Sequence, residues 1–335
     1  LILAPTRELA MQIETEAREY SKYMRKVHTV CVVGGVPYPA QMRKLARPYE
    51  ILIATPGRLI DYIHRGKINF SKLEFLVLDE ADRMLDMGFL EPVEEIASKT
   101  PSSRQTLMFS ATMQGSVAKL AERLLNKPME IVARSKRVSN DHIKQTLHYV
   151  NDIKHKNQLL DHILGLENVD STIIFTSTKR YAGQLVEDLM TKGHLAAALH
   201  GDMNQRQRTR TIEKVRRGKV NILVATDVAA RGIDVQGISH VINFDMPMSA
   251  EDYVHRIGRT GRAGETGTAL SFAAYKDGEM VKKIEKFTGH KIDIEEIEGL
   301  KPNIKPRSSK PKKRPFKKSF SGKKRFSKTS VQRKK

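Results

Sequence analysis

Short apolar runs, each the length of a buried strand, recur along this chain and constrain its fold more than any other feature. Residues 75–78 (Phe-Leu-Val-Leu) form one such run, and residues 51–54 form another. An unbroken apolar run of this length is typical of a strand covered on both faces, as in a parallel sheet. Between the runs, apolar residues such as Leu9, Ile13 and Ala17 recur every four positions, which predicts helices. The alternation predicts an α/β protein built on parallel sheets.

The 335 residues are enough for two domains, and the pattern divides accordingly. Residues 1–133 predict a doubly wound parallel sheet that lacks its first unit, because the chain opens inside an apolar run at Leu1. Residues 134–142 have no apolar periodicity and are predicted to be a linker. In residues 143–298 the alternation restarts and predicts a second sheet, closed by a helix at 279–288 and a short acidic segment. The predicted strands are residues 1–4, 28–33, 51–54, 75–78 and 106–109 in the first sheet, and 146–150, 171–176, 196–199, 221–225, 240–244 and 268–273 in the second.

The net charge of +21 is concentrated in the last part of the chain. Residues 301–335 contain 16 Lys or Arg and no Asp or Glu, so the first 300 residues carry a net charge of only +5. Self-repulsion of this kind predicts that residues 299–335 are disordered. Phe316, Phe320 and Phe326 lie among the cations, and aromatic rings between cations can stack on unpaired bases. We expect a polyanion-binding arm, and a merely solubilising tail is the alternative.

The composition excludes several classes of protein. The single cysteine, Cys31, excludes an intramolecular disulfide and favours a reducing, cytoplasmic compartment. No apolar stretch approaches the roughly 20 residues that span a bilayer, so no membrane partner is expected. The 11 His residues form no His/Cys cluster with the spacing of metal ligands, so we expect no zinc site.

Two carboxylates follow the apolar run at residues 75–78 directly. Asp79 and Glu80 would therefore lie at the carboxyl end of a strand, where ligands bind in open α/β sheets. Acidic groups at this place usually hold Mg²⁺ or orient a water for attack on a phosphate. A solvated strand end followed by a charged helix is the alternative reading of these residues alone.

Nine short motifs follow one another along the chain. They are Pro5-Thr6-Arg7-Glu8-Leu9, Gly34-Gly35, Thr55-Pro56-Gly57-Arg58, Asp79-Glu80-Ala81-Asp82, Ser110-Ala111-Thr112, Ile174-Phe175-Thr176, Gln205-Arg206-Gln207-Arg208, Ala225-Thr226-Asp227 with Ala230-Arg231-Gly232-Ile233-Asp234, and His255-Arg256-Ile257-Gly258-Arg259-Thr260-Gly261-Arg262. Their order and spacing resemble the DEAD-box family of ATP-dependent RNA helicases over roughly residues 1–275. The acidic segment and the Lys-, Arg- and Phe-containing tail resemble those of bacterial members.

This resemblance implies two RecA-like domains that use ATP and Mg²⁺. By resemblance, Asp79 holds Mg²⁺ directly or through a water, and Glu80 orients or deprotonates the attacking water. Arg259 and Arg262 contact the γ-phosphate, with Arg262 as the arginine finger, and Asp234 accepts a hydrogen bond from the ribose hydroxyl. A planar guanidinium suits this role because it meets phosphate oxygens with two parallel hydrogen bonds.

The resemblance also implies residues that couple the two domains and residues that bind RNA. The coupling residues are Asp82, Ser110, Thr112 and His255. RNA contacts come from small or basic groups at strand ends and helix starts, which approach phosphates without reading bases, so binding should be independent of sequence. The candidates are Thr6, Arg7, Gly35, Thr55 and Arg58 in the first domain, and Thr176, Gly201, Asp202, Gln205, Arg208, Thr226 and Asp227 in the second.

The sequence therefore predicts an ATP-dependent RNA helicase that couples ATP binding and hydrolysis to local duplex unwinding or to remodelling of RNA–protein complexes. The basic tail would then be an RNA-binding arm. The resemblance suggests proteins of ribosome assembly or RNA decay as partners, and a monomer is expected.

One expected part does not occur in the sequence. The family holds the triphosphate in a loop with the pattern Gly-x-x-x-x-Gly-Lys-[Ser/Thr], and neither this string nor the earlier adenine-reading glutamine segment is present. We expect a fragment that cannot hydrolyse ATP by itself, and a naturally shortened protein is the alternative. In that case a non-enzymatic RNA-binding or annealing protein, acting through the second domain and the tail, is the competing function. A translocating DNA helicase or a remodelling ATPase is a third possible function.

Overall fold

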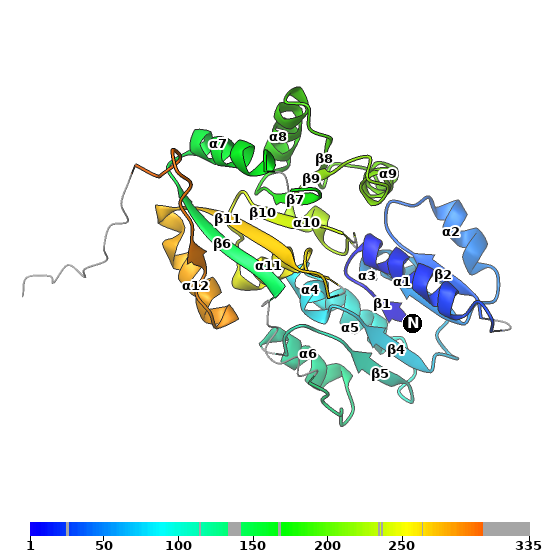
Figure 1. Ribbon diagram of the computed structural model, residues 1–335. Helices are drawn as coiled ribbons and strands as arrows, with labels where there is room; N and C mark the ends of the chain where they lie inside the picture. Colours follow the sequence, from blue (N-terminus) through cyan, green and yellow to red (C-terminus); the bar gives the residue numbers. More distant parts are fainter. Residues whose placement is uncertain are drawn as a thin grey trace, which may run out of the picture. The chain divides into compact units, whose positions relative to one another are not determined.

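The computed structural model describes residues 1–24, 27–113, 115–132, 142–166, 169–233, 235, 237–262 and 264–303. The chain divides into two units, Leu1–Pro302 and Asn303–Lys335. The first unit holds two parallel sheets, one of five strands and one of seven (Figure 1). The predicted α/β fold with two doubly wound parallel sheets is therefore confirmed. Most of the predicted linker and of the predicted disordered tail lies outside the described residues.

The first sheet has the strand order β2-β3-β1-β4-β5, and all neighbouring strands are parallel. Although β1 comes first in the chain, it lies between β3 and β4. All five strands predicted for this sheet are present, within one residue at most ends. The strands are β1 (Ile2–Leu3), β2 (Thr29–Val32), β3 (Ile51–Ala54), β4 (Phe75–Leu78) and β5 (Gln105–Met108), and the helices are α1 (Arg7–Tyr20), α2 (Tyr38–Leu45), α3 (Pro56–His64), α4 (Ala81–Asp86), α5 (Leu90–Ser98) and α6 (Ser116–Leu124).

The second sheet has the strand order β12-β6-β11-β10-β7-β9-β8, again with parallel neighbours. The predicted acidic segment contains a strand that the sequence did not indicate, β12, because its two residues are exposed and show no strand pattern. The strands are β6 (Ile143–Val150), β7 (Thr172–Phe175), β8 (Ala196–Leu199), β9 (Ile222–Ala225), β10 (His240–Asn243), β11 (Gly267–Ala274) and β12 (Asp293–Ile294), and the helices are α7 (Ile153–Leu164), α8 (Lys179–Thr191), α9 (Gln205–Arg216), α10 (Asp227–Ala230), α11 (Ala250–Ile257) and α12 (Gly278–Thr288).

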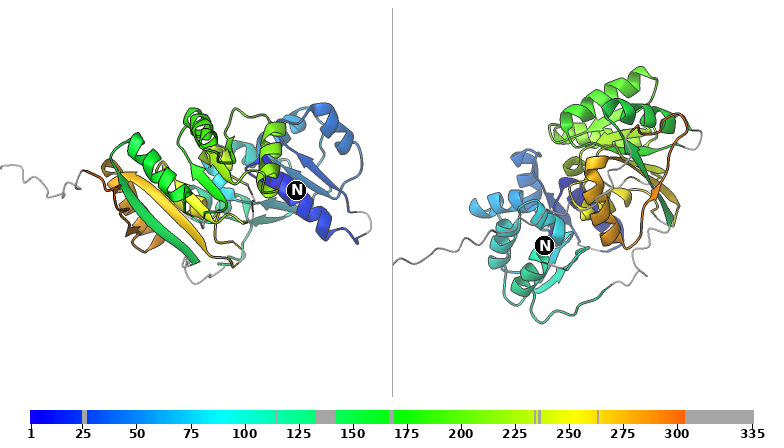
Figure 2. Two further views of the ribbon diagram at one scale, coloured as in Figure 1. Left: turned by 45° about the horizontal axis from the view of Figure 1, so that its top comes forward. Right: turned by 90° about the vertical axis from the view of Figure 1, so that its left-hand side faces the viewer.

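Both faces of the second sheet are covered by helices, which explains why its central strands β7 and β9 are buried at every residue. Along β7, Ile173 and Phe175 belong to the core that includes Tyr253 of α11 and Ile284 of α12. The residue between them, Ile174, points to the opposite face, where it packs with residues of α7 and α8. The green helices α7 and α8 and the orange helix α12 accordingly lie on opposite sides of the sheet (Figures 1 and 2).

The first sheet is built in the same way. Ala10 of α1 packs with Cys31 and Ile53 on one face, and α3, α4, α5 and α6 contribute to the core on the other. Burial raises the pKa of the Cys31 thiol to about 12, so this cysteine is a neutral core residue at physiological pH. No helix in the described part of the chain is long and apolar enough to cross a bilayer.

Candidate active site

The carboxyl end of β4 is followed by an unusual turn. Glu80 has φ 50° and ψ 53°, a left-handed backbone conformation that costs a non-glycine residue roughly 1–3 kcal/mol. Its backbone N–H donates to Asp79 Oδ1 at 3.0 Å, and α4 then begins at Ala81. Of the described residues other than glycine, only Lys127 shares a positive φ. Backbone strain of this kind clusters at active sites and switch regions, where it can be part of the mechanism.

The two carboxylates at this turn are partly withdrawn from water. Burial raises the pKa of Asp79; the Glu80 N–H opposes this shift, and the charge of Asp82 adds to it. Burial also raises the pKa of Glu80, and the positive charge of Arg259 is the strongest effect against it. Because Glu80 belongs to the first sheet and Arg259 to the second, the electrostatics of this site involve both sheets.

The donor set at the turn suits a small, hard cation. Mg²⁺ is usually held by one or two carboxylates together with waters and phosphate oxygens. Asp79 offers such an oxygen, with Glu80 beside it. The described residues contain no group of three or more His, Cys, Asp or Glu side chains that could hold a metal. A cation here would therefore take most of its ligands from water and from a bound phosphate.

The predicted phosphate-binding arginines follow α11. Arg259 Nη1 donates to the carbonyl of Ile233 at 2.6 Å, and Arg262 Nε donates to the carbonyl of Gly258 at 2.8 Å. Both side chains are half-buried. Arg259 is the one whose charge acts on Glu80. The remaining nucleotide candidate, Asp234, lies outside the described residues.

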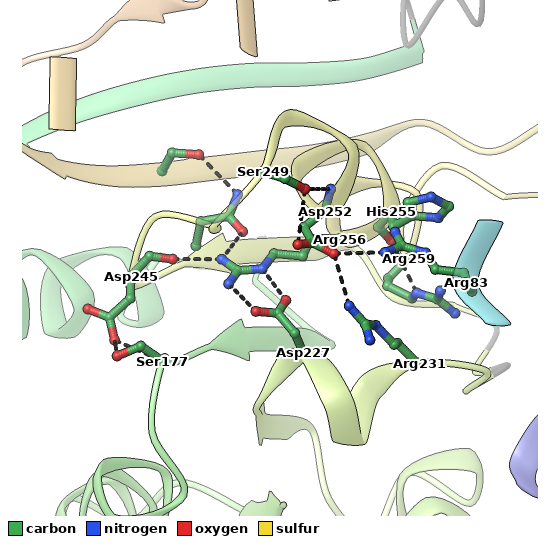
Figure 3. A network of polar contacts seen from close by, with 12 residues as sticks. Arg83, Ser177, Asp227, Arg231, Asp245, Ser249, Asp252, His255, Arg256 and Arg259 are labelled. Carbon is green, nitrogen blue, oxygen red and sulfur yellow. Dashed lines mark hydrogen bonds and ion pairs between the residues drawn. The ribbon is translucent and has the colours of Figure 1, made fainter. Parts of the chain in front are cut away.

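A polar network around α11 joins residues of both sheets (Figure 3). Arg83 of α4 donates from Nη1 to Asp252 Oδ1 at 2.8 Å and to Asp86 Oδ2 at 3.2 Å. Asp252 also lies 3.4 Å from Arg231 Nη2. Ser249 caps α11 through the Asp252 N–H and donates to Asp252 Oδ2 at 3.1 Å. Thus one carboxylate of the second sheet is shared by arginines from both sheets.

Beside this network, Arg256 is buried against the second sheet. Its guanidinium forms two hydrogen bonds with the Asp227 carboxylate, at 2.6 and 2.7 Å. It also donates to the carbonyl of Asp245 at 2.6 Å and lies 4.9 Å from the centre of the Phe175 ring. Asp227, a candidate RNA contact at the start of α10, is therefore held in a fixed position.

The hydrogen bonds that the structure gives Ser110 and His255 lie within their own segments, and the coupling role of these residues stays a prediction. Ser110 Oγ donates to the carbonyl of Thr112 at 2.7 Å, within its own turn. Asp82 Oδ1 is buried without a hydrogen-bond partner among the described residues. No hydrogen bond joins Asp82 to Ser110 or to His255 in the part of the chain that the structure describes. His255 lines a narrow hollow together with Arg83 and other residues of the network.

The candidate RNA residues of the first sheet lie at the carboxyl ends of its strands. Thr6, which follows β1, caps α1 by accepting from the Leu9 N–H at 3.2 Å. Thr55 stands at the start of α3, after β3. Arg58 Nη1 donates to the carbonyl of Val36 at 2.9 Å. Gly35 has φ 74°, a left-handed conformation that favours glycine, and a Cβ there would lie 2.5 Å from Arg7 Nη1.

Several candidates of the second sheet are placed in the same way. Thr176 follows β7 and is buried, and Thr226 stands at the start of α10. Gly201 and Asp202 are exposed after β8, with Asp202 Oδ1 2.8 Å from Lys179 Nζ. These residues, like those of the first sheet, are at strand ends or helix starts.

Gln205 and Arg208 of α9 contact the first sheet instead of solvent. Arg208 Nε donates to Glu8 Oε1 at 2.7 Å, and both side chains are less than a tenth exposed. Gln205 donates to the same carboxylate oxygen at 3.2 Å and accepts from Arg7 at 3.3 Å. The guanidinium of Arg208 is bound to Glu8. The position of Arg208 therefore favours a contact between the two sheets over a contact with an RNA phosphate.

Comparison with known proteins identifies the family. Residues 1–120 match the model of the DEAD/DEAH box helicase family, and residues 154–264 match the helicase conserved C-terminal domain. In solved structures, S. cerevisiae Dbp5 bound to RNA and ADP BeF3 matches with a TM-score of 0.80 and 31% identity, over 88% of this chain and 76% of that one. The chain belongs to the DEAD-box helicase family.

Named relatives of this DEAD-box chain come from yeast and bacteria. The ATP-dependent RNA helicase DBP2 of S. cerevisiae is 49% identical over 275 residues, which are 81% of this chain and 50% of that protein. The ATP-dependent RNA helicase DeaD of Mycobacterium tuberculosis is 43% identical over 288 residues, which are 86% of this chain and 51% of that protein. The chain spans about half the length of the curated relatives it matches.

Sequence reasoning missed four residues of this DEAD-box site: Glu8, Arg83, Asp252 and Arg256. Arg256 carried a usable signal, because it lies on the same helical face as the buried Tyr253, where an apolar residue is expected. Arg83 carried none. Its partner, Asp252, is 169 residues away in the chain, and nothing local distinguishes Arg83 from a surface arginine.

Proposed function

We propose that this protein is an ATP-dependent RNA helicase that couples ATP binding and hydrolysis to local RNA unwinding or to remodelling of RNA–protein complexes. The observation that carries the proposal is the strained turn at the carboxyl end of β4, which places Glu80 where the charge of Arg259, from the second sheet's side, acts on it. Phosphoryl transfer needs little more than positioning and charge neutralisation, which a carboxylate and an arginine on facing elements can provide.

ATP and Mg²⁺ are the proposed cofactors. Asp79 would hold the metal, which neutralises phosphate charge when bound. Arg259 and Arg262 would bind the γ-phosphate, and Asp234 the ribose. Glu80 would orient the attacking water and accept its proton, a task that its raised pKa favours.

RNA is the proposed partner, bound through its backbone and without sequence preference. The candidate residues Thr6, Thr55, Thr176 and Thr226 all stand at the carboxyl ends of parallel strands, and three of them also precede a helix. Helix starts present unpaired N–H groups that attract phosphates. The names of the relatives, ATP-dependent RNA helicases, support this assignment.

The remaining features are also proposals. We propose residues 1–133 as the ATP-binding domain, 134–142 as the linker, 143–298 as the C-terminal helicase domain and 299–335 as a basic RNA-binding tail. A cytoplasmic monomer that meets proteins of ribosome assembly or RNA decay agrees with the single cysteine and with the tail's charge.

The test of the proposed activity is Glu80→Gln in the protein as the cell makes it. We expect loss of RNA-stimulated ATP hydrolysis with RNA binding retained, because the amide keeps the shape of the carboxylate but cannot accept a proton. Glu95→Gln, at an exposed carboxylate paired with His64, is the matched control and should leave both properties intact. ATP turnover at the wild-type rate in Glu80→Gln would refute the role of Glu80.

A second candidate, RNA binding or annealing without ATP hydrolysis, is favoured by one observation. Residues 301–335 hold 16 Lys or Arg, with Phe316, Phe320 and Phe326 among them, and such a segment can bind RNA by charge and stacking alone. Annealing of complementary RNA strands would be measured with and without ATP. Equal rates, together with the absence of ATP hydrolysis, would favour this candidate over the helicase.

A further inference from the structure

Arg83 is a buried cation that reaches from one sheet to the other. It belongs to α4, which starts directly after Glu80, and its side chain is only 4% exposed. Two carboxylates accept from the same Nη1 atom: Asp252 of the second sheet at 2.8 Å and Asp86 of its own helix at 3.2 Å. A buried guanidinium is stable only while it is paired, so Arg83 needs these carboxylates in the arrangement that buries it.

Asp252 has an alternative partner as well. Arg231, which follows α10 in its own sheet, lies 3.4 Å from the same Oδ1 atom. Burial acts to raise the pKa of Asp252, but the hydrogen bonds and charges of Arg83, Ser249 and Arg231 outweigh it and leave the pKa lowered. The side chain is therefore a carboxylate that both arginines can bind.

The side chains of Arg83, Asp86, Asp252 and Arg231 can form two different sets of ion pairs. With the sheets together, Arg83 binds Asp252. If the sheets separate, Asp86 remains available to Arg83 and Arg231 remains available to Asp252, because each lies on the same side as its partner. An element with two satisfied arrangements can respond to ligands at both of its ends, because each arrangement is a discrete state.

Both ends of this group of ion pairs lie against residues of the proposed site. On one side, the charge of Arg83 acts on Glu80, three residues earlier in the chain. On the other side, Arg231 closes α10, the helix that begins at Asp227, a candidate RNA contact. A ligand that holds α10 in place therefore also influences which partner Asp252 takes.

We infer that Arg83 and Asp252 are positioning residues whose ion pair couples RNA binding at α10 to the placement of Glu80 in the ATP site. The inference rests on the proposed function. The pair contributes to closure because Arg83, while still in contact with Asp86, also binds Asp252, which fixes the start of α4 against the second sheet. Neither residue takes part in the chemistry of hydrolysis.

The test measures how much nucleotide tightens RNA binding. In the protein as the cell makes it, the dissociation constant for single-stranded oligouridine is determined with and without ADP and beryllium fluoride. The ratio of the two constants is the coupling factor. We expect Arg83→Met and Asp252→Asn each to lower this factor by about 2- to 30-fold, the usual effect of a single residue on the coupling between sites. The double variant should fall no further than either single one.

Two further variants separate coupling from mere stability. Lys156→Met removes another buried cation, one that pairs with Asp245 inside the second sheet, and should leave the coupling factor unchanged. Asp86→Asn removes the carboxylate that remains available to Arg83 when the sheets are apart. It should tighten RNA binding without nucleotide, by up to about fivefold because Asp86 is half-exposed. Additive losses, an equal loss in Lys156→Met, or weaker RNA binding in Asp86→Asn would overturn the inference.

Failure of the proposed function gives a different result. If nucleotide does not tighten RNA binding in the wild type, the helicase assignment fails. The Arg83–Asp252 ion pair is then tested by measuring the distance between the two sheets. Dyes on Glu122→Cys and Glu187→Cys, both exposed, report the separation of the two sheets in the RNA complex. A larger separation in Arg83→Met would support the pair as a contact between sheets, and an unchanged one would overturn it.

Discussion

At the scale of single residues, the site contains a residue whose backbone and side chain both lower the stability of the fold. Glu80 combines a strained left-handed backbone with a carboxylate whose charged form is disfavoured by burial. Neither property stabilises the protein. Both place a carboxylate of raised pKa where a water could be oriented, and active sites commonly trade stability for function in this way.

Glu80→Gln should therefore stabilise the protein at neutral pH. Because the pKa of Glu80 is raised in the folded state, its carboxylate destabilises the fold at high pH, and this cost disappears as the pH falls through the folded pKa. The neutral amide removes the cost, while the lost attraction to Arg259 opposes part of the gain. We expect an increase of up to about 1 kcal/mol in the free energy of unfolding at pH 7, measured with urea.

The pH dependence provides the control for this prediction. The difference between Glu80→Gln and the wild type should shrink as the pH is lowered, since the wild-type side chain becomes neutral as well. A difference that stays constant with pH would mean that the change in stability comes from packing and not from charge.

At the scale of elements, short polar caps set the positions of the helices that connect the two sheets. Asn204 and Gln207 form a reciprocal capping box at the start of α9, each side chain accepting from the other's backbone N–H at 2.9 Å. Gln205, the first residue of α9, and Arg208, directly after the capping box, both bind Glu8 of α1. The cap therefore fixes a contact between sheets as well as a helix end.

Asn204→Ala should weaken both the start of α9 and the contact between the two sheets. Losing an N-cap costs about 1 kcal/mol, measured as the free energy of unfolding in urea. We also expect a larger separation between the sheets by the dye pair described above, because Arg208 loses its fixed start. Asp152→Ala removes the cap of α7 at His155 and is the matched control. It should cost similar stability and leave the separation as it was.

Gly232→Ala should separate the sheets by direct collision. A Cβ at Gly232 would lie 2.1 Å from Thr6 Oγ1, and its φ of 70° disfavours any side chain. Gly218 has a similar φ of 67° with no atom within 4 Å, so Gly218→Ala carries the backbone penalty of about 1–2 kcal/mol alone. Only Gly232→Ala should change the dye separation. If both variants behave alike, the contact between Thr6 and Gly232 is not part of the closed arrangement.

Elements were predictable where the signal was local. The four-residue apolar runs identified β3 and β4, although β4 is buried on one face only: Leu76 and Leu78 are buried, while Phe75 is half-exposed. β12 was not identified, because two exposed residues become a strand only by pairing with β6. For the site, order and spacing located Asp79, Glu80 and Arg259, whereas the Arg83–Asp252 pair depends on how distant segments meet.

At the scale of the whole molecule, most of the net positive charge lies in the basic tail and not in the residues that form the two sheets. Residues 304–335 hold 15 of the 16 cations of the basic tail, while the first 300 residues are nearly balanced. Association with RNA through such a tail is governed by the release of counterions, and affinity then falls steeply with salt.

Truncation after Asn303 should flatten the salt dependence of RNA binding. Each contact with a single-stranded phosphate contributes about −0.7 to the slope of log affinity against log salt. We expect the magnitude of the slope to fall by at least about 2, corresponding to three or more phosphates. Replacing Phe316, Phe320 and Phe326 with Leu keeps the charge, so it should lower affinity through lost stacking and leave the slope unchanged. An unchanged slope after truncation would exclude the tail as an electrostatic anchor.

The pairing of β6 has a consequence for how the protein is made. β6 (Ile143–Val150) has only β11 and β12 as neighbours, and both belong to the last part of the described chain. At about 5–20 residues per second, a ribosome needs roughly 6–23 s to pass from Val150 to Gly267. During this time β6 exposes apolar side chains and unpaired backbone groups on both edges. A nascent chain should therefore be most prone to aggregate in mid-synthesis, when chaperones would have to shield one strand until its neighbours emerge.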